Sequence, residues 1–326
     1  MLLSKPKTHS THGSRSESIK IALAFVAIYL VWGSTYLAIR FAVETIPPLV
    51  TAGIRHTMAG GILLAWACAH GYRPRREHWG AGMILGALFF FIGHGTLHWA
   101  EQHVASGLAA LLIATEPMFI LVLAWATSQQ RISRISAVGL AVGVVGVAIL
   151  TGAELSAKNA SLIGLVAVLV GSLSWAAGVV ISPKLKLPTD ALARTAVPLV
   201  CGAVMLLVTA GITGEFRGLH WTAISLKSIF GLGYLITFGS IVAFTAYTWL
   251  LQRCPPTLVA THTYANPVVA VLLGWLLASE PLTSRVALAS VAILGAIVLI
   301  RRGERDTEKY PVKSVTEEME STEQCA

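Results

Sequence analysis

The sequence predicts an all-α integral membrane protein whose ten transmembrane helices form two inverted repeats of five, with both termini cytoplasmic. Three observations support this fold class. The 326 residues are 55% hydrophobic and only 12% charged, whereas soluble domains carry about 25% charged residues. Apolar segments long enough to cross a bilayer recur along the chain. The second half also repeats the first at a spacing of 150 residues.

A helix that crosses the bilayer needs about 20 mostly apolar residues. Ten segments meet this requirement: 20–41, 47–69, 79–99, 104–127, 134–152, 161–182, 191–212, 228–251, 256–278 and 283–301. The first repeat is expected to cover 20–152 and the second 161–301. Residues 1–19 and 302–326 are polar or charged, so we expect two flexible cytoplasmic tails.

Lys and Arg residues set the orientation, because they are enriched in cytoplasmic loops. With a cytoplasmic N-terminus, 18 of them fall on the cytoplasmic side and five on the opposite side. This asymmetry predicts that both termini are inside. It also requires an even number of crossings, which ten satisfies.

The repeat is carried by rare residues rather than by bulk identity. Aligned without gaps, 99–150 and 249–300 share eight identities in 52 positions. The matches include Trp99 with Trp249, Gln102 with Gln252, Pro117 with Pro267, and Trp125 with Trp275. The alternative is chance similarity between apolar helices. Five crossings per repeat would invert the second copy, which is the plan of many secondary transporters.

Several motifs resemble those of EamA-type proteins of the drug/metabolite transporter superfamily, closest to its bacterial pigment- and metabolite-exporter-like members. They are Val31-Trp-Gly-Ser-Thr-Tyr36, Arg55, Ala100-Glu-Gln102, Ser106-Gly-Leu-Ala-Ala-Leu111, Ala114-Thr-Glu-Pro117, Tyr264-Ala-Asn-Pro-Val-Val-Ala270 and Glu280-Pro-Leu-Thr283. The resemblance covers about 20–301. It implies a ten-helix unit in a bacterial inner membrane that moves small metabolites or amino acids outward through a central cavity.

Glu116 is the sharpest candidate for the solute site, because ionisable residues at membrane depth are usually functional. Pro117 follows it and should loosen the helix. The repeat partners are Asn266 and Pro267, so two helix breaks are expected at matching positions. Glu116 is interpreted as a proton-coupling or amine-binding carboxylate; the alternative is a protonated, structural Glu.

His94, His98 and Glu101 share one helical face, at spacings of four and three residues. The favoured interpretations are a hydrated cavity wall or an outer gate. A Zn²⁺ site is the alternative, but no convergent acidic cluster supports it, so we expect no resident metal and no cofactor. Arg55 should pair with an acid at its depth, either Glu101 or Glu44, in a structural or gating ion pair.

Further cavity residues are expected from polar and aromatic side chains near the midplane. They are Trp32, Thr35, Trp175, Tyr247, His262, Tyr264 and Asn266. Trp usually prefers the membrane interfaces, so midplane Trp32 and Trp175 suggest stacking on a solute or steric gating. Core packing is the alternative for both.

The sequence as a whole favours a secondary transporter that exports small organic solutes by alternating access. Its expected partners are the solute and the bilayer, without nucleic acid, and two fused repeats make a monomer sufficient. A divalent-metal carrier using His94, His98 and Glu101 is the alternative. An integral-membrane enzyme is disfavoured because the chain has no HExxH, GxSxG or Walker A motif.

Overall fold

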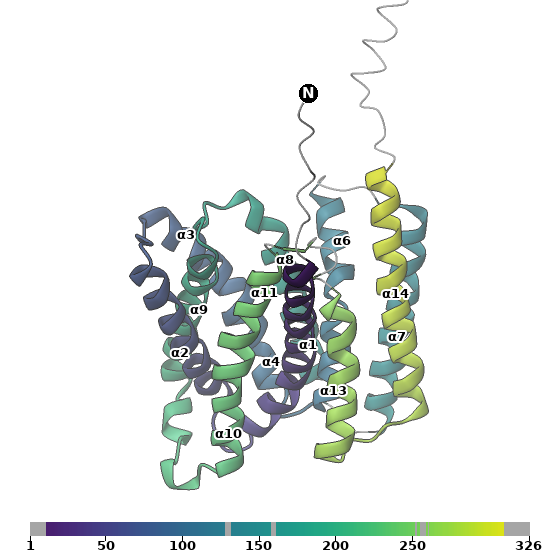
Figure 1. The fold of residues 1–326 in the computed structure, drawn as a ribbon. Coiled ribbons are helices and arrows are strands. Elements are labelled where there is room, and N and C mark those ends of the chain that lie inside the picture. Colours follow the sequence, from purple (N-terminus) through teal and green to yellow (C-terminus); the bar gives the residue numbers. More distant parts are fainter. Residues whose placement is uncertain are drawn as a thin grey trace, which may run out of the picture.

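A computed structural model describes residues 11–127, 132–157, 161–251, 253–254, 259 and 261–309. These residues form helices and connecting turns, with no strand among them. The helices stand side by side in one bundle (Figure 1). The start of α1 and the end of α14 lie at the same end of the bundle, which we call the terminus side (Figure 1). The opposite end is the far side.

The helices of the first half are α1 (Thr11–Ala42), α2 (Pro48–Ala69), α3 (Arg76–Leu85), α4 (Gly95–Ala100), α5 (Ser106–Ile113), α6 (Glu116–Ala126) and α7 (Arg134–Ala157). Those of the second half are α8 (Leu162–Ile181), α9 (Ala191–Thr213), α10 (Leu226–Tyr234), α11 (Ala243–Leu251), α13 (His262–Ala278) and α14 (Ser284–Lys309). Two π-helical segments, η1 (Gly86–His94) and η5 (Leu235–Val242), continue α3 into α4 and α10 into α11. Short 3₁₀ turns lie at Ser182–Lys184, Glu215–Gly218 and Trp221–Ala223.

Seven helical segments of the described chain are long and apolar enough to cross a membrane. Two shorter apolar helices, Arg134–Leu150 and His262–Ala278, accompany them. Large apolar side chains on the outer surface are exposed; Ile212, for example, is 81% exposed and Leu23 63%. Lipid is the solvent that favours such a surface.

The two halves repeat each other in their backbone as well as in sequence. α3 and α10 begin at Arg76 and Leu226, and α7 and α14 begin at Arg134 and Ser284. Both pairs of starts are separated by the 150 residues of the sequence repeat. The π-helical segments occupy corresponding places in the two halves. Because π-helical turns are rare and concentrate at functional sites, their duplication argues against chance similarity.

Helices from the two halves pack against each other throughout the bundle. α2 packs along α9, α7 along α14, and α1 along α13. The largest buried cluster draws on both halves and includes Ile39, Leu111, Leu165 and Ile297. The interface between the halves is therefore the core of the molecule, and polar residues within it lie between two similar units.

Glycine allows the closest of these contacts, between η1 and α9. A Cβ added to Gly202 would lie 2.5 Å from the Cβ of Phe90 and 2.8 Å from the carbonyl oxygen of Gly86. Small residues commonly allow backbones to approach in this way inside membranes. Gly80, one helix segment earlier, has open space where its Cβ would be.

Gly202→Ala is therefore expected to destabilise the protein by about 1–3 kcal/mol, the usual cost of overpacking a core. Gly80→Ala is the matched control and should be neutral or slightly stabilising, since Ala favours helix over Gly. Thermal unfolding of both variants in detergent measures the difference. Equal melting temperatures would contradict the close packing of η1 on α9.

Candidate functional site

A short turn at Ala114 and Thr115 interrupts the apolar segment that carries Glu116. α5 ends at Ile113, and α6 begins at Glu116 with Pro117 in its first turn. Between them, the Thr115 hydroxyl donates to the carbonyl oxygen of Leu112 at 2.6 Å. Glu116 thus lies at the N-terminus of α6, where exposed backbone N–H groups favour a negative charge.

Pro267 differs from Pro117. It lies inside α13, which runs without interruption from His262 to Ala278, so no helix break occurs at Pro267. A proline removes one backbone N–H from the hydrogen-bond ladder, and the rest of α13 maintains it. The matched prolines therefore break the helix in the first half alone.

Glu116 lies within electrostatic range of side chains from both halves. It interacts electrostatically with Tyr36 of α1, Tyr247 of α11 and Arg301 of α14. Arg301 also acts on His262 of α13. A carboxylate and a guanidinium thus lie in one polar region between the halves, with aromatic groups beside them.

Arg301 was not among the predicted site residues; it is the last residue of the predicted segment 283–301, next to the charged C-terminal tail. α14 continues past it to Lys309. Residues four apart share one face of a helix, and Ile297, four residues before Arg301, is fully buried. The four-residue spacing from the apolar Ile297 was the sequence signal that Arg301 faces the same side of the helix.

Trp32 joins the two halves beside this region. Its ring centroid lies 4.7 Å from that of His262, 5.2 Å from that of Tyr247 and 5.4 Å from that of Phe244. Its indole Nε1 donates to the carbonyl oxygen of Gly239 at 3.1 Å. Trp32 is therefore fixed in place as part of an aromatic wall.

Three other predicted residues, Thr35, Asn266 and Tyr264, are buried or partly buried. Thr35 is buried, and its hydroxyl donates to the Trp32 carbonyl at 2.6 Å. The Asn266 amide nitrogen lies 3.3 Å from His262 Nδ1, while its buried oxygen Oδ1 has no hydrogen-bond partner among the described residues. Tyr264 is partly buried and packs against the main core.

His94 and His98 lie in a second polar cluster, at the contact of α2 with η1 and α4. His94 Nδ1 is 3.0 Å from His56 Nε2, and its ring stacks on Trp175 with centroids 5.2 Å apart. His56 was not among the predicted site residues, because its contact with His94 joins two helices that are distant in sequence. No group of three His, Cys, Asp or Glu side chains among the described residues could hold a metal ion.

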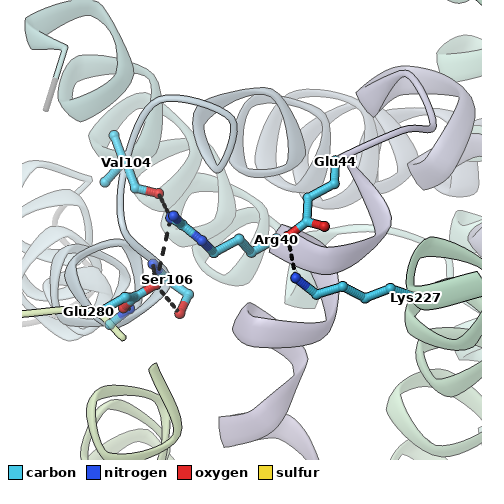
Figure 2. Close-up of polar contacts among 7 residues, drawn as sticks. Arg40, Glu44, Val104, Ser106, Lys227 and Glu280 are labelled. Atoms are coloured by element: carbon cyan, nitrogen blue, oxygen red, sulfur yellow. Dashed lines mark hydrogen bonds and ion pairs between the residues drawn. The ribbon is translucent and has the colours of Figure 1, made fainter. Parts of the chain in front are cut away.

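Arg55 does not contact either of its expected acids. Its Nε donates to the Ser240 hydroxyl oxygen at 3.1 Å, and Glu44 instead accepts from Lys227 Nζ at 2.6 Å (Figure 2). Glu101 acts on Arg55 electrostatically. The Glu101 carboxylate is buried close to the backbone of Arg40 but makes no hydrogen bond of good geometry with the described residues.

Glu280 connects the halves at the far side, although it was not among the predicted site residues. Its Oε1 accepts from the backbone N–H and the hydroxyl of Ser106, both at 2.8 Å, and Oε2 accepts from the Gly107 N–H at 3.0 Å. Arg40 reaches the same carboxylate, with Nη1 3.6 Å from Oε1 (Figure 2). A residue of the second half therefore caps α5 of the first.

The chain turns sharply to bring Glu280 there. Ser279 ends α13 in the left-handed conformation, at φ 54°, which is costly for a residue other than glycine. The Glu280 N–H then returns to the carbonyl oxygen of Gly274 at 3.1 Å. Beside this contact lies a cavity of about 360 Å³, whose lining includes Gln102 and Trp275.

Comparison with known proteins agrees with this architecture. The model of the EamA-like transporter family matches residues 19–152 and 162–302. The chain is 38% identical over 297 residues to the inner membrane transporter YedA of Escherichia coli (strain K12), covering 90% of this chain and 93% of YedA. It is 27% identical to the transporter YoaV of Bacillus subtilis (strain 168), covering 86% and 96%.

Two further similarities are more distant. Protein PecM of Dickeya dadantii is 26% identical over 273 residues, covering 83% of this chain and 89% of PecM. One solved crystal structure shares the fold with a TM-score of 0.59 and 21% identity, covering 88% of this chain and 99% of that one. The family match spans both halves of the molecule and most of its helices. The chain belongs to the EamA-like transporter family.

Proposed function

We propose that this protein is a secondary transporter that exports small organic metabolites or amino-acid-like solutes across the bacterial inner membrane by alternating access. The observation that carries the proposal is the repetition of helix starts and π-helical segments in two halves that share a polar interface. A site between two similar units can open to one side and then to the other when the units rock.

The proposed topology has ten crossings in two inverted repeats, 20–152 and 161–301, with both termini cytoplasmic. The 18-to-five excess of Lys and Arg supports this orientation. The terminus side is then cytoplasmic and the far side periplasmic. Two fused repeats supply both units, so a monomer is sufficient.

The proposed solute site lies around Glu116. Its carboxylate could bind an amine, and the Arg301 guanidinium could bind a carboxylate or phosphate group. Trp32, Tyr247 and His262 offer ring faces for the remainder of the solute. These groups favour a polar solute that carries charge and an unsaturated or aromatic part.

The contact of Glu280 with α5 is the proposed far-side gate. It holds the start of a first-half helix to the end of a second-half helix, so it must separate when the site opens to the periplasm. Arg40 strengthens the closed gate by compensating the buried charge.

Flux from reconstituted vesicles tests the function. Purified protein in proteoliposomes loaded with a bacterial metabolite extract should release particular solutes, identified by mass spectrometry of the external medium. Protein-free vesicles loaded with the same extract report leakage. If the two kinds of vesicle lose the same solutes at the same rates, the protein does not export any metabolite in the extract.

A further inference from the structure

Three histidines meet between α2 and the segment formed by η1 and α4. The rings of His56 and His94 stack with centroids 5.0 Å apart, and His98 completes the cluster at 6.4 Å and 6.1 Å from them. His56 and His98 are completely buried. We call these three residues the histidine cluster.

Two buried ring nitrogens of the histidine cluster, and both carboxylate oxygens of Glu101 three residues after His98, lack hydrogen-bond partners among the described residues. Five buried side-chain nitrogen or oxygen atoms have no hydrogen-bond partner among the described residues, and four of them are His56 Nδ1, His98 Nε2 and the two carboxylate oxygens of Glu101. Leaving such an atom unpaired costs about 1–3 kcal/mol. Buried polar atoms without partners are rare in proteins, so each of these atoms calls for an explanation.

The hydrogen bonds fix the state of His98. Its Nδ1 lies 2.7 Å from the carbonyl oxygen of His94. A carbonyl can only accept, so Nδ1 carries the hydrogen, and in the neutral ring Nε2 is then an unprotonated lone pair. His98 Nε2 is therefore a buried basic nitrogen with a free position for a proton.

The His56–His94 pair has room for one proton as well. In the neutral state one ring donates and the other accepts across the 3.0 Å contact between His94 Nδ1 and His56 Nε2. Adding a proton to the donor ring preserves this bond and makes it charge-assisted. Adding a proton to both rings would place two donors face to face, so the pair accepts one.

We propose that the histidine cluster is a proton-binding site of the transport cycle, loaded from the far side by way of Glu101. The inference rests on the proposed transport function. Glu101 lies at the end of α4, three residues after His98 on the same helical face, and the next residues, Gln102 and His103, are exposed. Because a proton needs no cavity, it can bind ring nitrogens that are fully buried, whereas a larger ligand cannot.

The charged surroundings provide a way to release the proton. Arg55 of α2 acts on all three rings, and its positive charge opposes an imidazolium. The negative charge of Glu101 stabilises the positive charge of Arg55, and Tyr36 of α1 interacts electrostatically with both residues. Trp175 of α8 contributes an uncharged ring face. An imidazolium is more stable where water reaches it, so protonation favours opening at the far side.

The test follows the far-side gate as a function of pH. Spin labels at Gln102→Cys and Leu282→Cys, with the native cysteines replaced, report the separation of the halves at the far side in the reconstituted protein. In the otherwise unchanged protein the population with the longer distance should rise as the pH falls from about 8 to about 5, by up to about tenfold per pH unit for one proton.

His98→Asn is the decisive variant, because its amide can still donate near the position of Nδ1 while Nε2 is removed. It should abolish the pH dependence. His103→Asn is the matched control: His103 Nδ1 also contacts the carbonyl four residues before it, at 3.3 Å, but its ring is exposed. His103→Asn should retain the pH dependence, and His56→Gln provides a second variant should His98→Asn fail to fold.

Persistence of the pH dependence in His98→Asn or His56→Gln would overturn the proton site. Metabolite export without any pH dependence of the gate would also overturn it, while leaving the transport function intact. A pH-dependent gate in vesicles that export nothing would instead count against the transport function and leave the proton site standing.

Discussion

Glu280→Ala is expected to lower the free energy of unfolding by about 3–5 kcal/mol, because it removes a buried carboxylate that accepts three hydrogen bonds and each hydrogen bond to a charged group contributes about 1.5–3 kcal/mol. The substitution leaves three donors at the start of α5 without their acceptor: the N–H groups of Ser106 and Gly107 and the Ser106 hydroxyl. Arg40 loses its carboxylate at the same time.

The control for this variant is Glu44→Ala on the same side of the bundle. Glu44 also pairs with a cation, but it is 39% exposed and Lys227 49%, and exposed ion pairs contribute no more than about 1 kcal/mol. Thermal unfolding in detergent should therefore separate the two variants clearly. Similar melting temperatures would show that Glu280 does not hold the halves together.

Glu116→Gln is expected to reduce solute flux about tenfold to a hundredfold, because a hydrogen bond to a charged group contributes about 1.5–3 kcal/mol. The variant is isosteric and keeps an acceptor at the start of α6, so the fold should not change. The effect is measured as the initial rate of export from proteoliposomes, normalised to the amount of reconstituted protein.

Glu77→Gln is its matched control. Glu77 is also an acid at the start of a helix, α3, but it is 40% exposed and contacts Lys186 and Arg75 outside the polar region between the halves. Its flux should equal that of the unsubstituted protein. Normal flux in Glu116→Gln would remove Glu116 from the transport site and leave it a structural role.

The sequence predicted an all-helical chain with apolar segments along its length, and it drew attention to Pro117. Ten crossings were predicted, and seven helical segments of the described chain are long and apolar enough to cross a membrane. Pro117 lies in the first turn of α6, directly after the turn that separates α6 from α5. The sequence could not show that α13 continues through Pro267, since tolerance of a proline depends on the rest of the helix. It also could not show the π-helical segments, which use the same apolar residues as ordinary α-helix.

The sequence pointed to those residues of the candidate site that stand out individually, but not to those that depend on partners from distant helices. Glu116, His94 and Trp32 stood out individually as polar or aromatic residues at membrane depth. His56, Arg301 and Glu280 acquire their partners from helices distant in sequence, at separations such as the 174 residues between Ser106 and Glu280. No local pattern encodes such contacts, and an ionisable residue near a span end is easily taken for part of a loop.

Paired distance measurements test alternating access most directly. One spin-label pair, Gln102→Cys and Leu282→Cys, reports the far side, and a second, Thr127→Cys and Arg253→Cys, reports the terminus side. All four positions are exposed. We predict that Glu280→Ala increases the population with a long far-side distance and, in the same sample, the population with a short terminus-side distance. Unchanged far-side distances, or two sides that open together, would contradict alternating access between the two halves.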